Sequence, residues 1–187
     1  MTYGPFYNDY AEPHIGVDPA AVTLAATNKA LIPVSNIPLL GAHFFGRVGR
    51  KVRIRLFGRI TTVLTPGNLT LGLLYGTGAD ANGVVLASSA AIALIASQTN
   101  ISFWLEWVVH CRSIGSTGTL FAVGRASFNP LVIASTAQPI LMPATAPVVS
   151  AACDLTSQSL VLSPQVLRSG STAEAITIHD VEYTPLN

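Results

Sequence analysis

The chain has 187 residues with ten basic and nine acidic side chains, which gives a formal net charge of +1 at pH 7. This balance argues against a nucleic-acid-binding protein held by bulk electrostatics. Polar residues interrupt the uncharged window 81–105 and four prolines interrupt the window 126–153, so neither predicts a membrane-spanning helix. Charged residues make up 10% of the chain, against about a quarter in an ordinary domain. We therefore expect other subunits to cover much of its surface.

Residues 1–42 differ from the rest of the chain and predict an extended N-terminal arm. Prolines recur throughout this stretch and oppose long helices and central strands. Only Asp18–Ala30 has the capping residue and first-turn proline of a short helix. Four aromatic side chains are candidate anchors on the chain's own domain or on a neighbouring subunit: Tyr3, Phe6, Tyr7 and Tyr10. A partly disordered tail is the alternative.

Residues 43–187 predict a single all-β domain. Short apolar or alternating segments follow one another between turn residues, with almost no helical periodicity. The predicted strands and apolar segments are 51–63, 69–75, 84–96, 101–112, 119–128, 130–133, 139–142, 147–155, 159–162 and 175–183. This spacing favours an antiparallel β-sandwich of jelly-roll type.

Basic residues gather at the start of this domain, where six of the ten fall between residues 47 and 59. The period of two over 51–63 predicts a strand with one buried face and arginines on the other. Because arginine pairs specifically with carboxylates, five arginines are candidate contacts to an acidic neighbouring subunit: Arg47, Arg50, Arg53, Arg55 and Arg59. A solvated strand face is the competing interpretation. Nucleic acid is less favoured, because no aromatic ladder accompanies the cluster.

Residues 101–112 form the clearest strand pattern in the chain. Trp107 falls on the apolar face and is predicted to lie in the core, while Trp104 shares the opposite face with Glu106 and His110. Trp104 is therefore a candidate exposed aromatic for a sugar or for a partner subunit. A second packed layer is the alternative.

Three segments, taken in chain order, resemble β-sandwich virion proteins of tailed bacteriophages. They are KVRIRLFGRITTVLTPGNLTLGLLYG, FWLEWVVHCRSIGSTGTLFAVGRASF and AITIHDVEY. Within that group the chain is most similar to capsid decoration, or cement, proteins with a jelly-roll body. The resemblance runs from about Arg47 to the C-terminus. It implies a homotrimer or similarly symmetric assembly on the outer surface of an icosahedral capsid, bound to the major capsid protein and without catalytic residues.

Two other functions stay open beside this structural role. One is a carbohydrate-binding module, free or on a phage fibre, that uses Trp104 and the loop Gly76–Gly83. The other is a small jelly-roll protein that builds the shell itself. Such RNA-virus shells usually carry a basic N-terminal arm for genome neutralisation, whereas residues 1–42 contain one lysine and no arginine.

Enzymatic chemistry is the least expected class. Neither a G-x-S-x-G elbow nor a phosphate-binding glycine loop occurs in the sequence, and no cofactor is expected. On a regular strand His179 and Asp180 point to opposite faces, so they share a metal ion only if a bulge intervenes. We expect Cys111 and Cys153 to be buried thiols of a protein made in a reducing host cytoplasm, although a disulfide between them is also open.

Overall fold

The computed structural model describes residues 22–23, 29–77, 83–134, 138–145, 150, 152–156, 159–168 and 174–186. These residues form twelve strands and one short 3₁₀ helix, η1 (Val34–Asn36). The strands are β1 (Val22–Thr23), β2 (Lys29–Ala30), β3 (Leu39–Leu40), β4 (Lys51–Thr61), β5 (Asn68–Thr77), β6 (Val84–Ser88), β7 (Ile92–Ala93), β8 (Ile101–Ser113), β9 (Thr119–Phe128), β10 (Ile140–Met142), β11 (Leu160–Arg168) and β12 (Ala175–Leu186).

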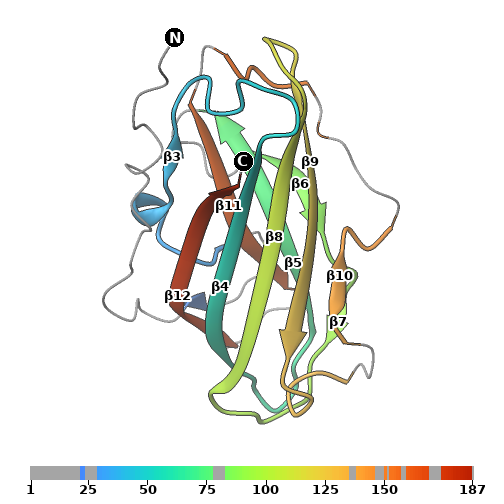
Figure 1. Ribbon diagram of the computed structural model, residues 1–187. Coiled ribbons are helices and arrows are strands. Elements are labelled where there is room, and N and C mark those ends of the chain that lie inside the picture. Colours follow the sequence, from blue (N-terminus) through green and yellow to red (C-terminus); the bar gives the residue numbers. More distant parts are fainter. Residues whose placement is uncertain are drawn as a thin grey trace.

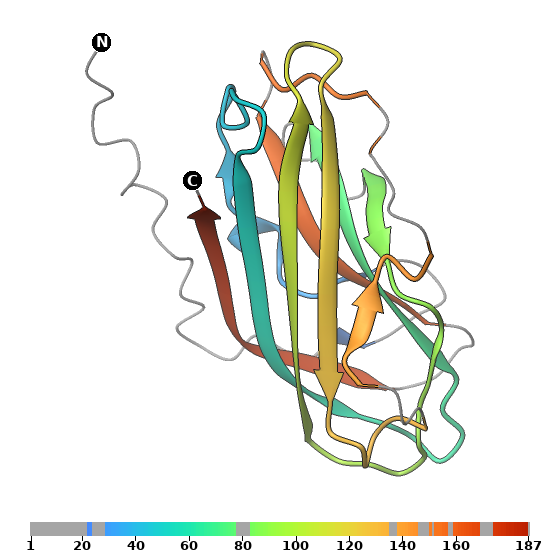
Figure 2. The same ribbon diagram turned by 45° about the vertical axis from the view of Figure 1, so that its right-hand side comes forward.

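The strands build two antiparallel sheets that pack face to face (Figures 1 and 2). Sheet A has the order β1-β12-β4-β8-β9-β10, and its long strands lie in front in Figure 1. Sheet B has the order β2-β11-β5-β6, with β3 added to β11 and β7 added to β5. The predicted all-β sandwich is confirmed.

Period-two alternation assigns the faces of the long strands as the sequence predicts. Along β4 each residue on the apolar side is buried and each residue on the other side is at least partly exposed. β8 alternates in the same way, with Trp107 completely buried as predicted. The two apolar faces close on each other, so burial of large side chains between the sheets supplies the main driving force for the fold.

The described part of the predicted arm packs along one edge of sheet B. β2 and β3 both pair with β11, and four apolar side chains of this stretch are buried: Leu31, Ile32, Ile37 and Leu40. The helix expected over Asp18–Ala30 is wrong at Val22–Thr23 and Lys29–Ala30, which are strands. There the backbone gains ladder hydrogen bonds from β12 and β11 that a short isolated helix lacks. The four anchor aromatics, Tyr3, Phe6, Tyr7 and Tyr10, lie outside the described residues, so their role stays a prediction.

Candidate functional site

The outer face of sheet A carries a row of alternating charges across four neighbouring strands. In register, Glu182 of β12 lies beside Arg55 of β4, then Glu106 of β8, then Arg125 of β9. Arg55 Nε lies 2.5 Å from Glu106 Oε2, and Arg125 Nη2 lies 3.3 Å from Glu106 Oε1. On the other side Arg55 Nη1 is 3.9 Å from Glu182 Oε2. We call this row the ion-pair ladder.

The ion-pair ladder is partly shielded from solvent, which strengthens its interactions relative to ordinary surface pairs. The Glu106 side chain is only 12% exposed although it faces outward. The pKa of Glu182 is lowered, first by the hydroxyl of Thr184, which donates to its carboxylate, and then by Arg53, whose Nη2 lies 2.9 Å away. Hydrogen bonding to Glu106 raises the pKa of Arg55 further. The Glu182 carboxylate is therefore held in the ionised form.

The ion-pair ladder shows which arginines of the predicted cluster have partners within the chain. Arg53, Arg55 and Arg59 share one face of β4 as predicted, but Arg53 and Arg55 pair with carboxylates of their own chain. Their pairing with an acidic neighbouring subunit, which the sequence suggested, stays a prediction. Arg50 lies before β4 and stacks its guanidinium 4.4 Å from the ring centre of Phe44.

Arg47 lies in the turn that leads into β4 and is exposed. Its backbone carbonyl accepts a 3.3 Å hydrogen bond from the Arg50 amide, which helps to close that turn. Arg47 thus lies outside the ion-pair ladder, although it is close in sequence to Arg55.

Two aromatic side chains lie next to the ion-pair ladder. Phe57 of β4 and Trp104 of β8 are register neighbours on the outer face, with Asp180 on one side and Ser127 on the other. Phe57 is 46% exposed, and the guanidinium of Arg125 lies 5.2 Å from the ring centre of Trp104. We call this row the aromatic row.

Trp104 and the described ends of the glycine-rich loop Gly76–Gly83 belong to different sheets. Gly76 and Thr77 end β5, and Gly83 directly precedes β6, both in sheet B, whereas Trp104 lies on the outer face of sheet A. Residues 78–82 lie outside the described residues, so a sugar site that combines Trp104 with this loop stays a prediction. The aromatic row is the part of that site that the structure describes.

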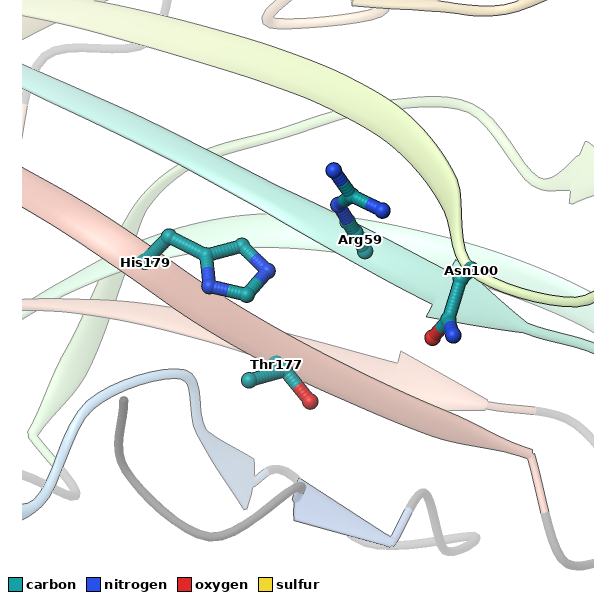
Figure 3. A pocket seen from close by; sticks show the side chains of 4 residues that line it. All are labelled: Arg59, Asn100, Thr177 and His179. Atoms are coloured by element: carbon teal, nitrogen blue, oxygen red, sulfur yellow. The ribbon is translucent and has the colours of Figure 1, made fainter. Parts of the chain in front are cut away.

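A pocket of 580 Å³ lies on the same face, two residues along β4 from Phe57 of the aromatic row, and its described lining residues are Arg59, Asn100, Thr177 and His179. Figure 3 shows these side chains, which come from β4, from the loop before β8 and from β12. Thr177 is the register partner of Arg59. The Arg59 guanidinium can only donate hydrogen bonds, whereas the other three side chains can also accept them, so the arginine is the group that favours a hydrogen-bond acceptor as ligand.

A β-bulge in β12 creates one wall of this pocket. The pairing with β4 skips from Ile178 to Asp180, and His179 is the extra residue. Ile178 and Val181 are buried, while His179 is partly exposed and Asp180 is exposed. The extra residue shifts the alternation by one, so β12 has here the bulge without which His179 and Asp180 were expected to point to opposite faces. Within the described part of the chain, no group of three His, Cys, Asp or Glu side chains is placed to hold a metal ion.

The charges of the molecule are divided unevenly between its two sheets. The strands of sheet A carry nine charged residues: Lys51, Arg53, Arg55, Arg59, Glu106, Arg112, Arg125, Asp180 and Glu182. The strands of sheet B carry two, Lys29 and Arg168. The strands of sheet B thus carry almost no ionic side chains.

With this geometry established, the chain was compared with known proteins. No family model and no curated protein matches it. Among the described residues no helix is long and apolar enough to cross a membrane.

The two cysteines are free, buried thiols. Burial raises the pKa of Cys111 and is also the largest cause of the raised pKa of Cys153. Because the thiolate is the reactive form, both residues are suited to packing rather than to nucleophilic or redox chemistry.

Several residues of these sites were not picked out from the sequence. The alternation places Glu106 on the outer face, but its partners Arg125 and Glu182 lie far away in the sequence and become neighbours only through the strand order. Asn100 begins an Asn-Ile-Ser tripeptide of the glycosylation pattern and Thr177 lies in the segment AITIHDVEY, but neither pattern indicates a pocket.

Proposed function

We propose that this chain is a structural virion protein, a decoration or cement protein on the outer surface of a tailed-bacteriophage capsid. In this role it forms a homotrimer and binds the major capsid protein. The sequence resemblance described above supports the proposal, as does a sandwich fold suited to stacking on a shell.

The observation that carries the proposal is the unequal charge of the two sheets, nine charged residues against two. Interfaces between permanently associated subunits are depleted in charge and more apolar than ordinary surface. Sheet B and its edges also leave apolar side chains exposed, among them Leu39, Val84 and Val85. We assign this uncharged side to contact between copies, and the charged face of sheet A to the shell or solvent.

The mass of the isolated full-length protein, measured by light scattering or native mass spectrometry, tests the subunit contact. We expect a trimer, and we expect Val85→Lys to dissociate it because Val85 is 46% exposed on β6. Val123→Lys is the matched control, since Val123 is 37% exposed on sheet A. Circular dichroism checks that both variants fold. A trimer that persists in Val85→Lys contradicts the assigned contact side.

Binding to empty capsids tests the virion role itself. We expect the protein to sediment with capsids from which decoration proteins have been removed, and to raise the temperature at which those capsids break. A protein that stays monomeric and does not bind capsids overturns the proposal.

Carbohydrate binding is a second candidate function, supported by one specific observation, the aromatic row. An exposed Phe57 beside Trp104, with the polar groups of Asp180 and Ser127 next to them, offers a stacking surface with hydrogen-bonding partners. A glycan array tests it: binding that disappears in Trp104→Ala favours this function, and no binding by the unaltered protein dismisses it.

A further inference from the structure

One arginine on the outer face of sheet A differs from its neighbours. Arg53, Arg55 and Arg125 each contact a carboxylate, and Arg112 stacks 4.3 Å from the ring centre of Phe121. Among the described residues, the Arg59 side chain makes no hydrogen bond, ion pair or ring contact. Instead it lines the pocket shown in Figure 3. A guanidinium beside a pocket, without a partner, is available to an added anion.

The pocket is built by backbone features rather than by a mobile loop. Gly58, next to Arg59, allows β12 to approach closely, since a Cβ there would lie 2.6 Å from the carbonyl oxygen of Thr177. The bulge then turns His179 toward the outer face. Asn100 has a left-handed backbone with φ of 54°, a conformation that asparagine tolerates well. Its N–H donates a 3.1 Å hydrogen bond to the hydroxyl of Thr61, which fixes its position.

The lining groups define the chemistry of the ligand. Arg59 supplies a permanent positive charge, and the Asn100 amide and the Thr177 hydroxyl supply further donors, while His179 forms part of the wall. Among the described lining residues there is no carboxylate; Asp180, which follows His179, lies in register with Phe57 on β4. A planar guanidinium with flanking neutral donors matches a carboxylate, the group that the other paired arginines of this face already hold.

We propose that Arg59, Asn100, Thr177 and His179 form a receptor site for the carboxylate of an Asp or Glu side chain in an acidic peptide segment, either of this protein or of another. This inference rests on the proposed assembly function and names the chemistry by which one of its contacts is made. The site binds by charge-assisted hydrogen bonds and involves no covalent step.

Two sources offer such a carboxylate. One is the chain's own sequence, of the same or a neighbouring copy: residues 1–28 contain Asp9, Glu12 and Asp18 but no lysine or arginine. This stretch includes β1, which pairs with β12 at Ala175 and Ile176, directly before Thr177. The other source is an acidic segment of the shell protein.

The test measures the affinity of a fluorescent peptide of alternating Glu and Gly for the full-length protein by anisotropy. Arg59→Gln removes the charge but keeps a side chain of similar polarity, and we expect it to weaken binding by about tenfold or more. Arg59→Lys keeps the charge but loses the forked geometry, so we expect its peptide affinity to lie between those of the unaltered protein and Arg59→Gln. Arg47→Gln is the matched control, because Arg47 is exposed and outside the pocket. Circular dichroism checks the fold of each variant.

A second arm identifies the source. In the full-length variant Asp9→Asn, Glu12→Gln, Asp18→Asn, tighter binding of the Glu-Gly peptide shows that the chain's own carboxylates compete for the pocket. Unchanged affinity in that variant, with capsid binding that depends on Arg59, assigns the carboxylate to the shell protein.

The site is overturned if Arg59→Gln changes the peptide affinity by less than about twofold, or if Arg47→Gln lowers that affinity as much as Arg59→Gln does. In either case a general attraction between surface charges, screened by salt, explains the binding. Absence of peptide binding by the unaltered protein overturns it as well. Failure of the virion proposal gives a different result. If the protein is a monomer that does not bind capsids but still binds the peptide through Arg59, the carboxylate site stands and the assembly role is contradicted.

Discussion

The phenolic hydroxyl of Tyr183 donates a 2.9 Å hydrogen bond to the backbone carbonyl of Leu162. Tyr183 belongs to β12 of sheet A and Leu162 to β11 of sheet B, so this bond joins the two sheets through the core. Both residues are buried, and no solvent replaces the bond if it is removed.

Tyr183→Phe is expected to lower the free energy of unfolding by about 1–2 kcal/mol, because the Leu162 carbonyl loses a buried partner while the ring is kept. Urea denaturation followed by tryptophan fluorescence measures the change. A fall smaller than about 0.5 kcal/mol would mean that the bond contributes little to holding the sheets together.

Alkaline pH is expected to weaken the fold through the same residue. Burial raises the pKa of Tyr183 above its ordinary value of 10.0, so the folded state keeps a proton that the unfolded state loses. The stability is complete below pH 10 and declines as the pH rises toward the folded-state pKa. Denaturation midpoints at pH 9, 10 and 11 (chosen around the ordinary value) measure this decline, which should be smaller in Tyr183→Phe.

Gly124→Ala is expected to destabilise the protein by about 1–3 kcal/mol, because a methyl group there overpacks the core. Its Cβ would lie 2.4 Å from Cδ1 of the buried Trp107 and 2.7 Å from the Glu106 carbonyl oxygen. Gly72→Ala in β5 is the matched control, since its nearest neighbour would be a Leu74 methyl at 3.5 Å. Thermal unfolding compares the two variants, and equal melting temperatures would contradict the packing argument.

Glu106→Gln is expected to cost about 1–2 kcal/mol, since two arginines lose a charged partner in a partly shielded site. Glu106 faces Arg55 on one side and Arg125 on the other. A double-mutant cycle with Arg55→Met isolates the pairwise energy. If the cycle gives no coupling, or if the loss is unchanged at high salt and low salt, the ion-pair ladder is not the cause.

Acid is expected to remove the contribution of Glu182. Its pKa is lowered, first by the hydrogen bond from Thr184 and then by Arg53, so its contribution is complete above the ordinary value of 4.5 and is lost as the pH falls through the folded-state pKa. Denaturation curves between pH 6 and pH 3 (about the range in which carboxylates titrate) should be flatter for Glu182→Gln. The exposed Asp180→Asn serves as control, and an equal flattening there would point to net charge instead.

Local alternation was sufficient to predict the faces of the long strands. β4 and β8 each repeat with a period of two, so burial of Ile54 and Trp107 and exposure of their neighbours follow from the pleat alone. The pattern predicted the strand that corresponds to β11 only over residues 159–162, and Pro164 is of a residue type that is disfavoured in strand interiors. In the structure the Pro164 carbonyl still accepts a hydrogen bond from Leu31, and the strand continues to Arg168.

The candidate sites depended on information that no single segment contains. The partners of Arg55 come from β8 and β12, which are about fifty and well over a hundred residues away. The bulge at His179, by contrast, leaves a trace in AITIHDVEY: Ile176 and Ile178 are two residues apart, as are Val181 and Tyr183, but Ile178 and Val181 are three apart. Strand order and one inserted residue thus decide which arginine has a carboxylate and which has a pocket.

The described sheets end on very short strands: β1 and β10 border sheet A with two and three residues, and β2, β3 and β6 border sheet B with two, two and five. β1 pairs with β12 only at Ala175 and Ile176, and β10 pairs with β9 only at Gly124, Arg125 and Ala126. Within the described residues most of β12 therefore keeps an open edge of backbone donors and acceptors, on which another strand can add. β12 carries Asp180 and Glu182 along its length and Pro185 near its end, and charged residues and proline on an edge strand oppose such addition between copies.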